Sequence, residues 1–214
     1  MDGSALLERV REASETELDR LGSEKALLAA TEARLETDAV LVTAAAVLTD
    51  AHETAAEWVS TAVSEAATEG IATTADRLGD AADRVRAELD DAVTADSGDL
   101  SAIDVPFLSL SGDSDAGRIG AVTIGLALVL DRLFLQSVSF FVNEADNARA
   151  DLFRDLRGVT EDILAVGQDA LDTLCVDDAD WDEAAEAATS TIDAAYAEYV
   201  DRLDAMGFDP KPIC

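Results

Sequence analysis

The sequence is poor in basic residues, and this shortage excludes one large class of partners. Only 15 of its 214 residues are lysine or arginine, against 46 aspartates and glutamates, so the formal net charge is −31. Nucleic-acid binding needs clustered Lys and Arg side chains that neutralise phosphates. A chain this acidic would repel a phosphate backbone, and we expect no nucleic-acid partner.

Cysteine, histidine and glycine-rich motifs are also scarce. Cys175 and Cys214 are too few for a disulfide scaffold and are wrongly spaced for a zinc site. The single histidine, His52, lies in a helical pattern without the glycines of a nucleophile elbow, which disfavours Ser-His-Asp or Cys-His catalysis. No Gly-rich loop follows a strand, so a phosphate-binding loop lacks its context. No basic region precedes an apolar N-terminal segment, so we expect a cytoplasmic location.

The acidic excess predicts a high-salt environment. A net charge of −31 on a small domain opposes the compact state by self-repulsion, which concentrated salt screens within about 3 Å at 1 M. A disordered acidic chain is the other class with such charge, but 49% of the residues are hydrophobic and they recur at helical spacing. We therefore expect one folded, halophilic domain over residues 1–214.

Helical periodicity dominates the chain. Of its three prolines, two lie in the last five residues, so long stretches contain no helix breaker. Short connections favour antiparallel neighbours, and the sum is an all-α, up-and-down helical bundle with a flexible acidic loop at about 94–116 and a short tail at 207–214. The pattern predicts six helical segments: about 4–21; a short one carrying Leu27, Leu28 and Leu35; 37–68; one that follows a break at Gly70 and runs through Leu89; 119–174; and about 180–206.

The fifth segment begins with an apolar run, Ile119 to Val142, that is long enough to cross a membrane. Asp131 and Arg132 lie at its middle, and each would cost about 2.5–3.5 kcal/mol at a bilayer centre. We therefore expect a buried central helix and no membrane partner. The small residues Gly117, Ala121 and Gly125 recur every fourth position and would let a neighbouring helix approach closely.

Metal binding is the chemistry that the bundle itself suggests. Carboxylate metal sites in bundles place Glu residues and Glu-x-x-His pairs on inward faces. Glu17 and Glu32 fall on apolar helix faces and His52 lies at the edge of one, but Thr49 occupies the position where a Glu-x-x-His pair needs glutamate. Two interpretations stay open. Carboxylates such as Glu17, Glu32 or Asp131 pair with Arg149 or Arg132 and fix helix register, or Glu17, Glu32 and His52 form a reduced metal site.

Several stretches resemble a rubrerythrin-like group of haloarchaeal proteins in the ferritin-like superfamily, and the resemblance covers most of the chain. It implies a ferritin-like bundle in which Glu32 is the first-helix carboxylate and the His52 region is the second-helix motif. It also implies an oxidoreductase with iron or another divalent metal as cofactor. The stretches that carry the resemblance are Leu18–Ala33, the segment from Glu53-Thr54 to Trp58, Phe140–Asp146 and Asp209–Cys214.

Two functions are thus expected from different classes. The favoured one is a non-catalytic bundle without cofactor that acts through contacts with an unknown protein partner or a second copy of itself. Its expected interface is the apolar fifth segment or the patch from Phe107 to Leu110. The alternative is a metal-binding oxidoreductase with the reduced carboxylate–histidine site.

The two functions differ in metal content. We expect protein purified in multimolar salt and loaded with iron to hold no stoichiometric metal, because Thr49 and the pair Asp80 and Asp83 leave two ligand pairs incomplete. Elemental analysis of the wild type and a Glu32→Ala/His52→Ala double variant of matched fold measures this. Stoichiometric iron, manganese or zinc that disappears in the variant would contradict the expectation and establish the alternative.

Overall fold

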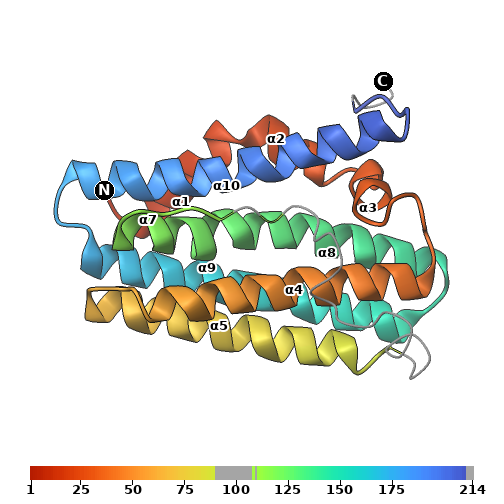
Figure 1. The fold of residues 1–214 in the computed structure, drawn as a ribbon, viewed down its shortest axis with the longest axis horizontal. Helices are drawn as coiled ribbons and strands as arrows, with labels where there is room; N and C mark the ends of the chain where they lie inside the picture. The colour runs from red at the N-terminus through yellow and green to blue at the C-terminus, as the bar shows by residue number, and fades with distance from the viewer. Residues whose placement is uncertain (90–107, 109, 211–214) are drawn as a thin grey trace.

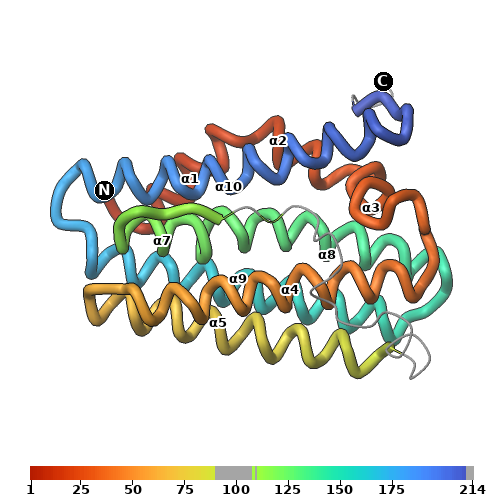
Figure 2. Tube along the Cα trace, in the orientation of Figure 1, coloured from red at the N-terminus to blue at the C-terminus, as the bar shows by residue number. Residues whose placement is uncertain are grey.

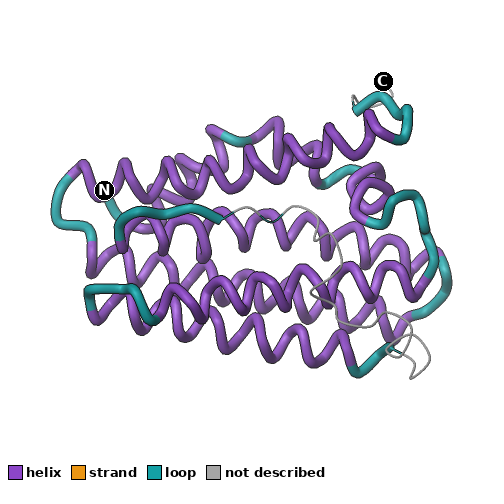
Figure 3. Tube along the Cα trace, in the orientation of Figure 1, coloured by secondary structure: helices purple, strands orange, loops and turns teal. Residues whose placement is uncertain are grey.

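The computed structural model describes residues 1–89, 108 and 110–210, and every regular element in these ranges is helical (Figure 3). An all-α bundle is therefore confirmed. The predicted 94–116 loop and 207–214 tail lie partly outside the described residues. The elements are α1 Gly3–Ala13, α2 Glu15–Leu21, α3 Glu24–Ala30, α4 Thr37–Val59, α5 Glu65–Arg86, α7 Asp115–Ile119, the π-helix η2 Gly120–Gly125, α8 Leu126–Asn143, α9 Asn147–Leu174 and α10 Asp178–Ala205.

Several predicted helix boundaries are wrong, among them the end of the second segment, because α3 ends at Ala30, before Leu35. The first segment is not continuous to Leu21, because α1 ends at Ala13 and the buried Ser14 separates it from α2. The third segment ends at Val59 rather than near residue 68, and the break expected at Gly70 lies instead at residues 60–63. Gly70 is inside α5, where a Cβ would lie 3.1 Å from the Ala170 Cβ, so this glycine serves helix packing rather than chain reversal.

The predicted fifth segment, 119–174, is a hairpin of two helices rather than one element. The chain reverses after α8 through Ala145, which adopts a left-handed φ of 59°. Asp146 then caps α9 by accepting a hydrogen bond from the Arg149 backbone N–H at 3.1 Å. Apolar periodicity continues across this turn because both helices bury one face, and for that reason the pattern alone did not reveal the reversal.

The predicted central apolar helix is confirmed as the continuous stretch α7–η2–α8. Residues Asp115–Asn143 have a mean hydropathy of 1.7 in their most apolar window, and 78% of that window is buried inside the protein. By length and composition this helix could cross a membrane, but here α9 and α10 cover it. Most apolar side chains of this stretch are buried in the core, so few of them are available for the interface expected on the fifth segment.

Figures 1 and 2 show the order of the long helices. The pairs α4/α5 and α8/α9 are antiparallel, and α5 also packs against α9. However, α5 ends and α7 begins at opposite ends of the bundle, so α5 and α8 run in the same direction (Figure 2). The helix α10 lies along α7 and η2, and the short helices α1, α2 and α3 pack along α10.

Glycines let α10 approach the central helix very closely. A Cβ added at Gly120 would lie 2.1 Å from the Ala184 carbonyl oxygen, and one at Gly125 would lie 2.6 Å from the Ala188 carbonyl oxygen. Both distances are far below van der Waals contact, so only glycine fits. The close approach falls on the π-helix, where the wider turn changes which residues face α10. The absence of side chains at Gly120 and Gly125 thus allows the close contact between the central helix and α10.

This packing predicts that two glycine substitutions change the free energy of unfolding differently. Gly120→Ala should lower the free energy of unfolding by about 1–3 kcal/mol or more, because its Cβ overlaps main-chain atoms of α10. Gly158→Ala, in α9, should be neutral or stabilising by up to about 1 kcal/mol, because nothing lies within 4 Å of its Cβ and alanine favours helix. Chemical denaturation in multimolar salt measures both, and equal effects would contradict the close-packing account.

Candidate functional site

Among the described residues, the interior of the bundle contains no buried Asp, Glu, His, Lys or Arg side chain. Its buried hydroxyl groups are those of serine and threonine residues and the phenol of Tyr199. Most of the serine and threonine hydroxyls donate back to a carbonyl of their own helix, as Thr74 does to Gly70 at 2.9 Å and Ser137 does to Leu133 at 3.0 Å. Most of these hydroxyls are satisfied locally, although the buried Ser14 hydroxyl has no hydrogen-bond partner. Among the described residues, the core between α4, α5, α8 and α9 contains neither a buried carboxylate nor a buried imidazole.

His52 lies on α4 at the contact with α5. Its Nδ1 is 2.8 Å from the Ala75 carbonyl oxygen of α5. Because a carbonyl oxygen only accepts, Nδ1 carries the hydrogen and the lone pair is on Nε2. The ring rests on Gly79, where a Cβ would be 3.1 Å from Nδ1. The absence of a side chain at Gly79 therefore makes room for this histidine.

A groove of about 490 Å³ surrounds His52, and its walls come from α4 and α5. Asp76, Asp80 and Asp83 contribute its carboxylates. Arg86 neutralises Asp83 across 2.9 Å and also donates to the Thr49 hydroxyl. Thr49, which replaces the glutamate of a Glu-x-x-His pair, thus acts as a hydrogen-bond partner of an arginine.

The other two predicted ligands lie on different elements and have different neighbours. Glu17, on α2, faces α10. Burial and, secondly, the charge of Glu17 raise the pKa of Asp193 there. Glu32 is exposed, because it follows α3 in a turn with a left-handed φ of 51°, and its nearest cation is Arg202 at 3.8 Å. Its predicted place on an inward helix face is therefore wrong.

The structure does not bring Glu17, Glu32 and His52 together. α4 packs on α5, whereas α2 and α3 pack on α8 and α10. Within the described ranges, no three His, Cys, Asp or Glu side chains are grouped closely enough to hold a metal ion.

The register interpretation is supported for Asp131, which has the expected partner Arg132 and a second, closer partner that was not expected. Asp131 of the central helix accepts a hydrogen bond from Arg157 of α9 at 2.7 Å and lies 3.7 Å from Arg132. Arg149 pairs instead with Asp146 at 2.8 Å and with Glu88 at 3.5 Å. The Asp131–Arg157 pair links α8 to α9 and so fixes the register of that hairpin.

The surroundings of Cys175, which follows α9, disfavour its thiolate form. Burial, followed by the charges of Asp180, Asp172 and Asp177, raises the pKa of its thiol to about 11. The reactive form of a cysteine is the thiolate, which such surroundings suppress. Its predicted partner Cys214 lies outside the described residues.

Large exposed apolar side chains gather at the two ends of the bundle. Val63, in the turn between α4 and α5, is 92% exposed, and Val176, between α9 and α10, is 87% exposed. Both turns lie at the same end, which also holds the N-terminus (left in Figure 1). The less exposed Leu35, Val142 and Phe208 belong to segments at the other end. We call the end with Val63 and Val176 the valine end.

Carboxylates hold both valine turns in place. The Val63 and Ser64 backbone N–H groups donate to Asp115 at 3.1 and 2.7 Å, respectively. Arg118 donates to the Thr61 carbonyl at 2.9 Å. At the second turn the Val176 N–H donates to the Asp180 carboxylate at 2.8 Å. The two valines are therefore exposed at ordered positions.

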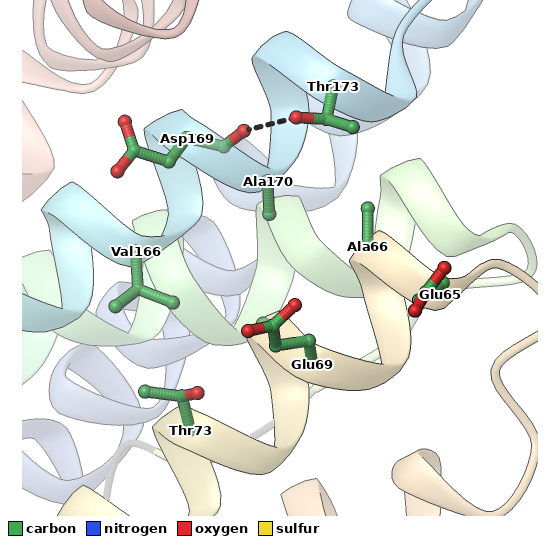
Figure 4. Close-up of a pocket in the computed structure, with 9 residues that line it drawn as sticks. Glu65, Ala66, Glu69, Thr73, Val166, Asp169, Ala170 and Thr173 are labelled. Carbon is green, nitrogen blue, oxygen red and sulfur yellow. Dashed lines mark hydrogen bonds between the residues drawn. The ribbon is translucent and has the colours of Figure 1, made fainter.

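Figure 4 shows a groove of about 490 Å³ between the first turns of α5 and the last turns of α9, close to the valine end. Its floor consists of small side chains such as Ala66 and Ala170. Glu65 and Glu69 from α5 and Asp169 from α9 stand around it on separate sides. The groove therefore lies next to the valine end and has acidic side chains at its edge and small apolar side chains at its floor.

Comparisons with known protein families, curated proteins and solved structures found no match.

Asp115 should make the first valine turn sensitive to acid. Burial raises the pKa of Asp115, but hydrogen bonds from Ser64 and Val63 and the charge of Arg118 outweigh it, so the net pKa is below its ordinary value. A lowered pKa in the folded state means that its contribution is present above about pH 4 and is lost as the pH falls through the folded pKa.

We therefore expect Asp115→Ala to cost about 1 kcal/mol of unfolding free energy at neutral pH and to speed amide hydrogen exchange at Val63 and Ser64. Asp113 is exposed, so Asp113→Ala should change neither the free energy of unfolding nor the exchange of these two amides. Exchange rates at pH 7 and pH 3 measure the effect. An Asp115→Ala variant with wild-type exchange at these two amides would show that the carboxylate does not order the turn.

Proposed function

We propose that this protein is a non-catalytic bundle of a high-salt cytoplasm that acts by binding another protein through its valine end. The observation that carries the proposal is the near-complete exposure of Val63 and Val176 on two turns that carboxylates hold in place. Leaving a valine exposed forgoes about 1.5–3 kcal/mol of burial, which a docked partner would recover. The sides of the bundle are acidic and would remain solvated.

An interior whose described residues include no buried Asp, Glu, His, Lys or Arg is consistent with a binding role. Enzymes that use acid–base or metal chemistry place titratable groups in a concave, partly buried site. Among the described residues, most buried serine and threonine hydroxyls donate within their own helices. Two exposed valines whose backbones are held in place suit recognition, since an ordered backbone loses little conformational entropy on binding.

The test compares the two ends of the molecule. Tagged wild-type protein, a Val63→Asp/Val176→Asp variant and a Leu35→Asp control are used to capture partners from native extract in multimolar salt. We expect a partner that wild type and Leu35→Asp retain and the double variant loses, with at least a tenfold drop in affinity. Leu35 is a matched control because it is 46% exposed at the opposite end. A partner retained equally by all three would contradict the valine end as the interface.

Self-association is tested with the same variants. If the partner is a second copy, sedimentation should show a dimer for the wild type and for Leu35→Asp and a monomer for the double variant. The proposed function is wrong if neither the sedimentation behaviour nor the set of captured partners differs among the three proteins.

A second proposal rests on the orientation of His52. We infer that, as the alternative function, this protein is a ferritin-like, rubrerythrin-like metalloprotein that binds iron or another divalent metal near His52. Two observations support it. The Nδ1 hydrogen bond to Ala75 leaves the Nε2 lone pair available, as in metal-bound histidines. Two antiparallel helix pairs joined by one long connection are also the connectivity of ferritin-like bundles. Metal analysis of the Glu32→Ala/His52→Ala variant tests this alternative.

A further inference from the structure

Ion pairs join α5 to α9 at a regular interval. Arg77 of α5 pairs with Asp162 of α9 at 2.7 Å, and Arg84 of α5 pairs with Asp155 of α9 at 3.2 Å. The two pairs lie seven residues apart on both helices, which is about two helical turns. The helices are antiparallel here, because the residue numbers rise on α5 while they fall on α9. Arginines of α5 thus neutralise carboxylates of α9 along the contact between the two helices.

The next position in this series has no arginine. Seven residues before Arg77 stands Gly70, and seven residues after Asp162 stands Asp169. Gly70 is buried, and a Cβ there would lie 3.1 Å from the Ala170 Cβ. Because the two helices pack this closely, position 70 cannot supply the arginine that would meet Asp169.

The groove shown in Figure 4 lies at this position. The carboxylates of Glu65, Glu69 and Asp169 line it, and none of the described residues that line it is basic. Its floor is apolar and includes Gly70 and Ala170. This combination suits an arginine side chain, because the methylene groups of arginine pack on apolar surface while its guanidinium donates to carboxylates.

Building on the proposed function, we propose that this groove binds an arginine side chain of the protein that docks on the valine end. The bound arginine takes the place that Arg77 and Arg84 have in the two neighbouring pairs. A guanidinium has five N–H donors in a fixed fork, so one arginine can donate to carboxylates of both α5 and α9. The groove lies close to the valine end, so a partner that covers Val63 and Val176 can also place a side chain in it.

A tethered arginine tests the site without the partner itself. Val176→Cys in a Cys175→Ser/Cys214→Ser background gives the chain a single thiol at the valine end. Asp169 lies about 10 Å from this thiol along the helix axis, a span that three extended peptide residues cover. The amidated peptides Cys-Gly-Gly-Arg and Cys-Gly-Gly-citrulline then compete for the thiol by disulfide exchange in multimolar salt. Citrulline is the matched probe, because it has the size of arginine without its positive charge.

We expect the arginine peptide to be favoured about fivefold over the citrulline peptide. The preference should disappear in Glu69→Gln/Asp169→Asn, which removes two carboxylates of the groove. It should also disappear in Thr73→Arg, which keeps these carboxylates but places an arginine of the chain itself at the groove. The control Glu53→Gln/Glu57→Gln removes two exposed carboxylates from the last turns of α4 and should leave the preference unchanged.

Equal binding of the two peptides by the Val176→Cys protein would overturn the arginine site. So would an equal loss of preference in the α4 control, because the attraction would then come from the acidic surface as a whole. Neither result would contradict the proposed function if Val63→Asp/Val176→Asp still loses its partner, since that capture depends on the valines and not on the groove.

Discussion

The close contact between α10 and the central helix is the constraint on which the other packing depends. At Gly120 and Gly125 the backbones of the two helices meet with no side chain between them. A third glycine, Gly167 of α9, lies against Thr123 of the π-helix from another side, where a Cβ would be 2.0 Å from the Thr123 hydroxyl oxygen. The central helix is therefore fixed between α9 and α10. The α4/α5 hairpin is positioned against α9 and the central helix through α5.

Acidic side chains and the most exposed apolar side chains occupy different parts of this molecule. Among the described residues, most acidic side chains lie on the solvated faces of the helices, whereas the most exposed large apolar residues, Val63 and Val176, are in turns at one end. Lateral association of two such bundles would bring carboxylates together, and salt would have to screen them. Under the proposed function, a partner would instead meet the two exposed valines at one end of the bundle.

The candidate ligands illustrate how far a helical pattern can be used. The angular argument correctly placed His52 beside an apolar face, and the structure puts it at the α4–α5 contact. It failed for Glu32, because α3 ends at Ala30 and the next residues turn in left-handed conformations. An inward position is meaningful only if the helix continues through it. Helix ends depend on capping and on tertiary contacts as well as on periodicity.

The sequence by itself determined the helical class, the burial of the 119–142 run and the scarcity of basic surface, because these follow from composition and from the 3.6-residue period. Tertiary structure alone decided that the chain breaks at Ser14, that 119–174 is a hairpin and that Glu17, Glu32 and His52 lie apart. Periodicity identifies the apolar face of each helix but not the helix that covers it. Which faces meet depends on glycine contacts such as Gly120 with Ala184, whose partners are far apart in the chain.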